Sequence, residues 1–380
     1  MKKTLLLLSS FFLSLFLLTG MVEAKTTTVD KLEVHYIDVG QGDATLIKCG
    51  DSAMLIDAGE NDKGTLVQNY IKKQGVKNLD YLIVTHPDSD HCGGADVIIT
   101  KYDINKVIMP DYEKDTNTYR DVIDALDYKN YKITVPVVGN TYKLNDAKFT
   151  IIAPNDVYED ANNSSVGIIL EHGKKKFIFT GDAEEDAEAD IVSNKAKIKA
   201  DVYKVNHHGS KTSSSSAFLK AIDPVYAVIS CGESNEYGHP DAQTLNSLRA
   251  MDVKLFRTDE QGSIMATSDG KTITWNASPT ETWQAGESKQ SAKASSTSKT
   301  TGSSAAATTS NIVETPAVAE VPQQEITQTP ATITYVLNTK SKKFHKLTCG
   351  SLPTANRSDT NMSRDEIIGQ GYEPCKKCNP

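Results

Sequence analysis

Long apolar runs are scarce in this chain. Apart from the run between Leu5 and Leu18, no stretch is long and apolar enough to span a membrane. Excess positive charge is also absent, because 41 Lys and Arg stand against 49 Asp and Glu and give a formal net charge of −8. A phosphate-rich ligand would therefore need a local cluster of positive charge or a metal ion. Cysteine is sparse too, and we interpret the scattered Cys49, Cys92 and Cys231 as buried thiols rather than as a disulfide framework.

The first 24 residues have the pattern of a secretory signal peptide. Lys2 and Lys3 precede the apolar run, and Val22-Glu23-Ala24 has the small-x-small form of a cleavage site. We expect cleavage after Ala24, which would make the mature protein secreted, extracellular or associated with the cell wall, with no stable membrane partner. A retained N-terminal anchor is the alternative, because the run approaches the length that spans a bilayer.

Composition divides the remaining chain into three parts. Residues 30–275 alternate strand-like and helical segments and predict one large α/β domain. Residues 276–330 are rich in Ser, Thr, Ala, Pro and Gln with almost no large apolar residues, so we expect a disordered linker. Residues 331–380 form a small module in which eight Lys and Arg stand against four Asp and Glu.

Residues of metal-binding type follow one strand-like run. Tyr81 to Val84 is apolar, and the loop after it carries His86, Asp88, Asp90 and His91. An ordinary polar turn is the alternative, but four ligand-type side chains within six residues favour a metal site at the end of a strand.

Two further strand-like segments end in similar residues. The segment from Lys176 to Thr180 is followed by Asp182, and the segment from Asp201 to Val205 is followed by His207 and His208. Functional residues gather at strand ends in layered α/β folds, so three such ends predict one site. We expect helices at 63–73, 119–126, 184–193, 214–221 and 241–251. We expect strands at 32–39, 44–48, 53–56, 81–84, 107–109, 148–152, 166–171, 176–180, 201–205 and 227–230, and closing strands after residue 251 up to Trp275.

These segments together resemble the metallo-β-lactamase superfamily over roughly residues 32–275, and within it the soluble hydrolase domain of ComEC, a bacterial DNA-uptake channel protein. The resemblance implies a four-layer αββα sandwich with the site along one edge. The matching blocks are VHYIDVGQGDATLI at 34–47, MLIDAG at 54–59, VTHPDSDHCGG at 84–94, NNSSVGIIL at 162–170, FIFTGDAE at 177–184, VNHHGSKTS at 205–213 and YGHP at 237–240.

The resemblance also implies roles for the metal-binding residues. His86 and Asp88 fall at the first metal position of the superfamily, and Asp90 and His91 fall at the second. Asp182 falls at the carboxylate that bridges the two metals.

One position of the second site is open between two neighbours. Either His207 or His208 completes it, and we favour His207 because it follows the strand end directly. The first site departs from the family pattern, because Asp88 stands where many members have His, and residues 162–165 offer only Asn and Ser where another His is usual.

The resemblance implies a hydrolase that uses one or two ions, and the oxygen-rich ligands make Mn²⁺ a rival to Zn²⁺. A cation at such a site acidifies a bound water, which then serves as the nucleophile. Asp90 is the expected group that orients or deprotonates this water. His208, Ser210, Lys211 and His239 are candidates for binding a substrate anion or protonating the leaving group, and the alternative for each is a helix cap or an ordinary loop residue.

Other polar residues of these blocks have supporting roles in our interpretation. His172 stands in a hairpin turn and His35 in the first strand, and we expect neither to bind metal. Four residues are expected to hold the loops around the site: Asp38, Gln41, Asp43 and Asp57.

The C-terminal module carries a separate metal pattern. His345, Cys349, Cys375 and Cys378 form two close pairs, a spacing typical of a structural Zn²⁺ site. Disulfides are the alternative in an oxidising compartment, although three cysteines cannot all be paired. The segment resembles the Ada-type zinc-binding module, with His345 in place of a Cys, and this resemblance together with the basic charge suggests contact with a nucleic-acid backbone.

The leading functional hypothesis is a secreted, metal-dependent phosphodiesterase or nuclease whose zinc module binds the nucleic-acid substrate. A hydrolase of an ester, lactone or β-lactam bond is the second hypothesis. A non-catalytic extracellular protein that binds nucleic acid is the third, since the first metal site departs from the family pattern.

Overall fold

The computed structural model describes residues 29–194, 197–286, 335–346, 349, 352, 357–360, 367 and 372–375. The predicted signal peptide, Cys378 and most of the predicted linker lie outside these residues. The chain divides into two compact units, Met1–Gly302 and Ser303–Pro380, each of which is described by itself.

Two mixed sheets form the large unit. The first has the order β15-β14-β1-β2-β3-β4-β5-β6, and the second has the order β13-β12-β11-β10-β9-β8-β7. The strands of the first sheet are β1 (Leu32–Tyr36), β2 (Thr45–Cys49), β3 (Ser52–Ile56), β4 (Asn78–Ile83), β5 (Asp103–Ile108), β6 (Ile133–Thr134), β14 (Ile264–Ser268) and β15 (Ile273–Trp275). Those of the second are β7 (Thr141–Leu144), β8 (Ala147–Ala153), β9 (Gly167–His172), β10 (Lys175–Phe179), β11 (Val202–Lys204), β12 (Tyr226–Ile229) and β13 (Lys254–Arg257).

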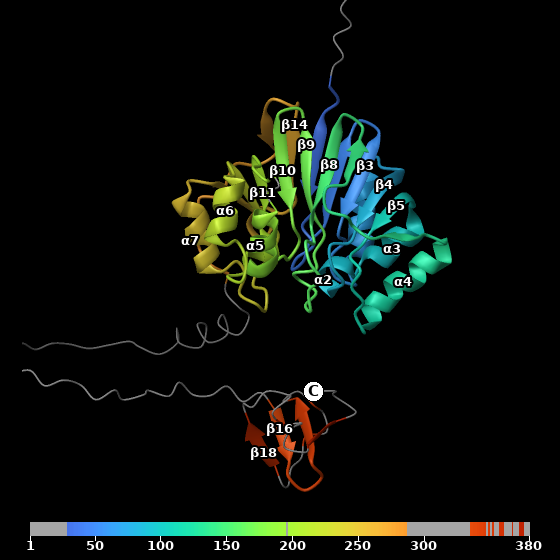
Figure 1. Cartoon of the computed structure of the whole chain (residues 1–380), viewed down its shortest axis with the longest axis vertical. Coiled ribbons are helices and arrows are strands. Elements are labelled where there is room, and N and C mark those ends of the chain that lie inside the picture. Colours follow the sequence, from blue (N-terminus) through green and yellow to red (C-terminus); the bar gives the residue numbers. More distant parts are fainter. Residues whose placement is uncertain are drawn as a thin grey trace, which may run out of the picture. The chain divides into compact units, whose positions relative to one another are not determined.

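Helices cover the outer face of each sheet, so the unit has four layers (Figure 1). The first sheet is covered by α1 (Gly64–Lys73), α3 (Ala95–Lys101) and α4 (Asn117–Lys129). The second is covered by α5 (Glu185–Ser193), α6 (Ser216–Ile222) and α7 (Ala242–Ala250). The expected αββα arrangement is confirmed.

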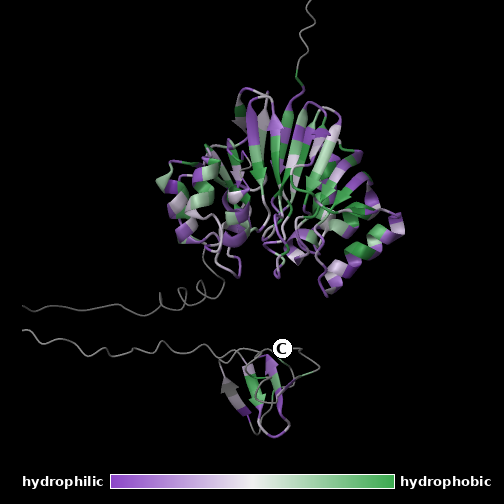
Figure 2. Ribbon diagram, viewed as in Figure 1, coloured by the Kyte–Doolittle hydropathy of each residue, from purple (hydrophilic) through white to green (hydrophobic). Residues whose placement is uncertain are grey.

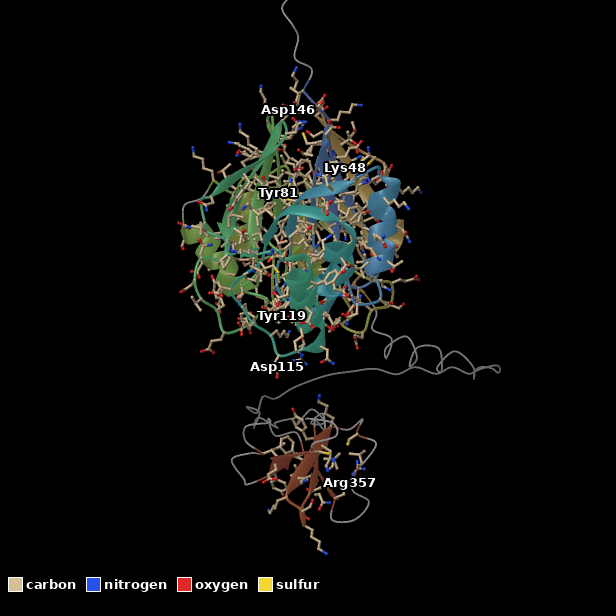
Figure 3. All side chains as sticks on the ribbon, turned by 90° about the vertical axis from the view of Figure 1, so that its right-hand side faces the viewer. Lys48, Tyr81, Asp115, Tyr119, Asp146 and Arg357 are labelled. Atoms are coloured by element: carbon tan, nitrogen blue, oxygen red, sulfur yellow. The ribbon has the colours of Figure 1, made fainter. Side chains whose placement is uncertain are left out.

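The alternation of side chains between the two faces of each strand explains the four layers. On β10, Phe177 and Phe179 face the core between the two sheets, whereas Ile178 between them faces the core under the helices. Figure 2 shows the hydrophobic residues concentrated on the strands and the hydrophilic ones on the outer helices and loops. Tyr81, labelled in Figure 3, is partly buried and packs edge-on against Phe149 of the core between the sheets, with ring centroids 4.9 Å apart.

The parallel strands bring distant loops to one edge. Strands β3, β4 and β5 run parallel to one another in the first sheet, and β10, β11, β12 and β13 do so in the second. Their carboxyl ends meet at the end of the unit where α2 (Ser89–Cys92) lies (Figure 1). Tyr119 and Asp115 lie toward this end, opposite Asp146 (Figure 3). The loops that carry the predicted ligands therefore converge.

The expected helices all form, with ends that differ by up to a few residues. Among the elements that the sequence-based expectation omits are α2, α3, β6 and β7. Helix α3 contains the run Val97-Ile98-Ile99-Thr100, and such β-branched residues have low helix propensity in isolation. Packing against α4 and α1 decides its structure.

The boundary of the large unit lies further along the chain than the composition predicts. Residues 276–286, assigned to the linker, lie against the domain: Thr280 N donates to Leu255 O at 2.7 Å, and Gly286 N donates to Pro240 O at 2.9 Å. Trp283 packs against the core under α5, α6 and α7, and apolar burial of this ring stabilises the segment.

The smaller unit contains a four-stranded sheet of order β18-β16-β17-β19. Its strands are β16 (Tyr335–Asn338), β17 (Lys343–Lys346), β18 (Arg357–Thr360) and β19 (Glu373–Pro374). Leu337, Phe344, Ile367 and Tyr372 form a small core. Small modules of this size usually need a metal or disulfides for stability.

Of the helices within the described ranges, none combines the length and the apolar character needed to cross a bilayer.

Candidate metal centre

The loop after β4 carries two of the predicted ligands on a short helix. Asp90 and His91 belong to α2, and the backbone of the loop is fixed by bonds to neighbouring segments, including Asp43 N to Asp90 O at 3.0 Å and Ala58 N to His91 O at 2.8 Å. Gly93 lies so close to the backbone of Glu60 and Asn61 that a side chain there would clash. The loop is therefore held closely against its neighbours.

The carboxylate of Asp57 orients His91. Asp57 Oδ2 lies 2.9 Å from His91 Nδ1 and accepts from Thr85 Oγ1 at 2.7 Å, while Oδ1 accepts from Thr85 N at 2.8 Å. A carboxylate beside Nδ1 keeps the proton on that nitrogen and leaves Nε2 free to bind a metal.

The turn after β11 orients His208. Asn206 anchors this turn, because its Oδ1 accepts from Thr180 Oγ1 at 2.5 Å and its Nδ2 donates to Glu188 Oε1 at 2.9 Å. His207 and His208 both have left-handed backbone angles, with φ of 49° and 53°. His208 Nδ1 then donates to Ser230 O at 3.0 Å, so its Nε2 also faces inward.

The two imidazoles meet between two carboxylates. His91 Nε2 and His208 Nε2 lie 3.3 Å apart. Asp182 lies 3.2 Å from His91 Nε2 through Oδ1 and 3.3 Å from His208 Nε2 through Oδ2, and Asp90 Oδ2 lies 3.0 Å from His208 Nε2. These separations match the edge of a tetrahedron with metal–ligand bonds of about 2.0 Å, which is roughly 3.3 Å.

This arrangement requires a positive charge. With both Nδ1 atoms protonated, neutral rings would direct two lone pairs at each other across 3.3 Å. Asp182 Oδ1 is buried without a hydrogen-bond partner among the described residues. A divalent cation satisfies all of these atoms at once, so the residues fit a metal ion of the N/O-binding class.

The pKa values express the same requirement. Burial raises the pKa of Asp182, but His208 and His91 outweigh it and hold that pKa well below its usual range. Burial lowers the pKa values of His91 and His208, but the surrounding carboxylates, Asp182 foremost, raise both well above the usual value. Burial also raises the pKa of Asp90, but His91 and His208 outweigh it and hold that pKa below its usual range. The site therefore combines ionised carboxylates with a strong demand for positive charge.

A buried ion pair lies behind His208. Asp43 Oδ2 is 2.7 Å from Lys204 Nζ, and Asp43 Oδ1 is 3.5 Å from His208 Nδ1. Asp43, His91, Asp182 and His208 each offer a ligand atom within 4.8 Å of the others. Asp43 lies on the Nδ1 side of the His208 ring, and this nitrogen already donates to Ser230 O. We therefore interpret Asp43 as a residue that orients His208 rather than as a metal ligand.

The choice between the two neighbouring histidines is corrected by the structure. The sequence-based preference for His207 places the wrong ring in the cluster, because His208 Nε2 is the atom that meets His91, Asp90 and Asp182. His207 Nδ1 instead lies 3.1 Å from Glu184 Oε1, and its Nε2 is 3.8 Å from Asp182. His207 and His208 both have left-handed backbone angles, and these angles determine the directions of the two side chains. Their order after the strand end does not reveal those directions.

The two residues expected at the first metal position differ in their surroundings. His86 is buried beside His91, with ring centroids 4.2 Å apart, and its Nε2 has no hydrogen-bond partner among the described residues. Asp88 forms an ion pair with Lys114 from the loop before α4. His86 is thus available to a cation, while Asp88 is already neutralised.

His239 lies beside the two neighbouring histidines of the turn after β11. Its ring lies 6.3 Å from that of His208, and its buried Nδ1 has no partner among the described residues. Burial, together with His208 and His207, lowers its pKa to about 4. The backbones of Ser210 and Lys211 hold the turn in place, since Ser210 O accepts from Thr244 Oγ1 and Lys211 N donates to Asp241 Oδ2.

The remaining histidines of the domain are structural, as expected. His172 Nδ1 lies 3.0 Å from Ser268 Oγ and its Nε2 lies 2.9 Å from Asp30 O, while His35 Nδ1 lies 3.1 Å from Tyr70 OH. Cys49, Cys92 and Cys231 are buried free thiols, also as expected. Asp38, Gln41, Asp43 and Asp57 all make bonds that hold loops at the site edge.

The second predicted metal site lies in the smaller unit. His345, Cys349 and Cys375 are buried with ligand atoms within 4.8 Å of one another, and His345 Nδ1 is 3.5 Å from Cys349 Sγ. Cys349 forms no disulfide. This donor set fits Zn²⁺, and the fourth expected ligand, Cys378, lies outside the described residues.

Sequence reasoning missed two lysines. Lys204 is 2% exposed although it lies in a strand, and a charged residue among apolar strand neighbours is the signal that could have identified it. Lys114 lies in a polar loop, where nothing local distinguishes it from an ordinary surface residue.

Known bacterial proteins share the sequence of the large unit. ComE operon protein 3 of Bacillus subtilis is 30% identical over 270 residues, which are 65% of this chain and 34% of that protein. Recombination protein 2 of Haemophilus influenzae is 32% identical over 61% of this chain and 28% of that protein. Competence protein ComA of Neisseria gonorrhoeae is 29% identical over 66% of this chain and 35% of that protein. The matched region spans about a third of the length of these relatives.

Among solved structures, the metallo-β-lactamase fold protein YhfI of Bacillus subtilis is similar, with 12% identity over 63% of this chain and all of that one, at a TM-score of 0.43. The model of the metallo-β-lactamase superfamily matches residues 37–233, which is more than half of the chain and includes Asp43, His91, Asp182 and His208. The chain belongs to the metallo-β-lactamase superfamily.

Proposed function

We propose that this protein is a secreted, metal-dependent phosphodiesterase that cleaves nucleic acid. Members of the superfamily are generally metal-dependent hydrolases. The observation that carries the proposal is the meeting of His91 Nε2 and His208 Nε2 at 3.3 Å between Asp90 and Asp182, because this group demands a cation.

Asp90 and His239 have different roles in the proposed reaction. A cation bound here would acidify a water molecule and polarise a phosphoryl oxygen. The side chain of Asp90 is 19% exposed, against 4% for Asp182, so Asp90 is the carboxylate that can reach an attacking water and accept its proton. His239 is uncharged at neutral pH, because its pKa is lowered to about 4, and it serves as a hydrogen-bond partner for a substrate oxygen rather than as a proton donor.

Two observations support nucleic acid as the substrate. Relatives are named as competence and recombination proteins, and we extend the handling of DNA that those names suggest to this chain. The C-terminal module is basic in sequence, and we propose that it holds Zn²⁺ through His345, Cys349, Cys375 and Cys378 and contacts the phosphate backbone of the substrate.

The test is a cleavage assay on the mature full-length protein. Single-stranded DNA, double-stranded DNA, RNA and cyclic dinucleotides are incubated with Mn²⁺ or Zn²⁺, and at least one is expected to be cleaved. Asp90→Ala should reduce the rate by about 100-fold or more, because it removes a metal contact and the proton acceptor together.

The matched control is Asp115→Ala. Asp115 is a carboxylate whose side chain is 99% exposed, in the loop before α4, and its removal should leave cleavage unchanged. Absence of cleavage of every substrate, or equal rates for the Asp90 variant and the wild type, would refute the proposal. Hydrolysis of a chromogenic β-lactam or ester without cleavage of nucleic acid would favour the second hypothesis instead.

A further inference from the structure

Three aromatic rings form a column from the surface to the metal centre. The ring of Tyr237 is stacked on that of His239, with centroids 5.5 Å apart and planes at 20°. The ring of His239 is in turn stacked on that of His208, with centroids 6.3 Å apart and planes at 26°. The innermost ring belongs to a predicted metal ligand, and the outermost is a tyrosine.

The outer end of this column is open to solvent. Tyr237 is 63% exposed, whereas His239 is 8% exposed and His208 is 1% exposed. Most of the Tyr237 side chain is therefore in contact with solvent, next to a buried pair of histidine rings. One face of the Tyr237 ring is covered by His239, so an aromatic surface remains available beside the site.

The loop that carries the column is held in place before any ligand binds. Asn235 Nδ2 donates to Gly232 O at 2.9 Å and to His239 O at 2.6 Å, and Asn235 Oδ1 accepts from His239 N at 3.0 Å. The segment ending at Gly286 packs over the carbonyl of His239, where a side chain at Gly286 would clash. A ring presented by a fixed loop loses little conformational freedom on binding.

The charges around Tyr237 indicate what kind of group would stack on it. Asp90, Glu236 and Glu60 lie close enough to add to the effect of burial in raising the pKa of its hydroxyl. These carboxylates disfavour a phosphate on the ring itself. An uncharged, flat group suits this surface, while a phosphate linked to it suits the cation between His91 and His208.

We propose that the ring of Tyr237 is a stacking platform for one nucleobase of a single-stranded substrate, next to the phosphate at the metal centre. The proposal rests on the proposed function and names the form of nucleic acid that the site takes. A base within a duplex already has both faces stacked, so single strands, frayed ends and unpaired bases can use the platform and an intact duplex cannot.

Fluorescence of a base analogue tests the contact directly. The full-length holoenzyme is mixed with a nuclease-resistant phosphorothioate trinucleotide that carries 2-aminopurine, whose emission is quenched by stacking. The wild type, Tyr237→Phe and Tyr237→Trp should quench it, whereas Tyr237→Ala and Tyr237→Leu should bind about 5- to 150-fold more weakly. Tyr128→Ala, which removes a tyrosine that is 82% exposed on α4, is the matched control and should behave as the wild type.

Cleavage kinetics separate a contact with the base from an effect through His239. With single-stranded oligonucleotides, Tyr237→Ala should raise KM by the same factor. With methyl p-nitrophenyl phosphate, a small phosphodiester that lacks a base, the loss of activity in Tyr237→Ala should be clearly smaller than with the oligonucleotides. Equal losses of cleavage activity on the oligonucleotides and on methyl p-nitrophenyl phosphate would overturn the proposal, because Tyr237 would then act only by positioning His239.

The outcomes also separate this proposal from the proposed function. Quenching that depends on Tyr237, without cleavage of any phosphodiester, would refute hydrolysis and leave the base contact standing. Cleavage of nucleic acid by a wild-type protein that does not quench, or quenches equally when Tyr237 is replaced by Ala, would refute the platform alone. Cleavage of an intact duplex and of its single strands at equal rates would also overturn it.

Discussion

Replacement of Lys204 by Met should strongly destabilise the large unit. Lys204 and Asp43 are 2% and 5% exposed, and their charged atoms are 2.7 Å apart. Met fills a similar volume but leaves the carboxylate of Asp43 buried without its cation. Lys204 Nζ also donates to Val205 O at 3.0 Å, and that bond is lost with it.

The size of the effect follows from the burial. Removing one member of a buried ion pair costs about 3–5 kcal/mol of the free energy of unfolding. His208 Nδ1, at 3.5 Å from Asp43, still compensates part of the charge, so we expect the lower half of that range, about 3–4 kcal/mol. For a unit of this size the loss corresponds to a decrease in Tm of roughly 6–15 °C.

The measurement is denaturant unfolding followed by tryptophan fluorescence. The chain has two tryptophans, Trp275 and Trp283, and both lie in the large unit, so the signal reports on that unit alone. The double variant Lys204→Met/Asp43→Asn should recover more than half of the loss, because no unpaired charge remains. Lys199→Met is the control: Lys199 pairs with Asp223 on the surface, and its removal should cost at most about 1 kcal/mol.

Acid should remove the difference in the free energy of unfolding between Lys204→Met and the wild type. Burial raises the pKa of Asp43, but Lys204 and His208 outweigh it and lower the pKa to about 2 from its ordinary value of 3.8. A carboxyl group with a lowered pKa stabilises the fold above its unfolded pKa, and this contribution is lost as the pH falls through the folded value. The gap between the two proteins should therefore narrow between about pH 4 and pH 2.

Two results would refute this reasoning. A loss below about 1 kcal/mol in Lys204→Met would mean that Asp43 is solvated or compensated by another group. A double variant less stable than Lys204→Met alone would mean that the carboxylate, rather than the pair, stabilises the fold.

Three further predictions concern the metal ions. Asp57→Asn should weaken metal binding by about 10- to 100-fold in a chelator competition, because Asp57 orients the ring of His91, and unchanged affinity would contradict that role. His208→Ala should abolish metal binding by the large unit, whereas His207→Ala should retain it in elemental analysis, and the reverse result would restore the original assignment. Cys375→Ser should remove the zinc of the smaller unit without changing the metal of the large one, and equal zinc content in variant and wild type would exclude this cysteine as a ligand.

Local sequence was sufficient for most strands and most helices, and it identified the strand ends whose loops converge. Strand β10 could be predicted from its apolar run, and the residue type that follows it, Asp182, marked it as one of the functional strand ends. Such signals are local: alternation and spacing depend on residues near one another in the chain. Helix α3 escaped prediction because its β-branched residues form a helix only when packed against α1 and α4.

The choice between His207 and His208 could not be made from the sequence. The two side chains differ in position by one residue, and their directions depend on two left-handed backbone angles. Those angles are held by bonds that connect Asn206 to Thr180 and Glu188, which are distant in the chain. The tertiary structure alone brings these groups together.

The sequence by itself determined the superfamily, the four-layer architecture and the chemical character of the ligands, because blocks such as VTHPDSDHCGG specify both a strand end and its ligand types. Only the tertiary structure decided which nitrogen faces the cluster, that Lys204 pairs with Asp43 behind His208, and that the ring of Tyr237 is stacked on that of His239. The physical reason is that residue type sets what an atom can bind, whereas its distance and direction to a partner depend on how separate strands pack.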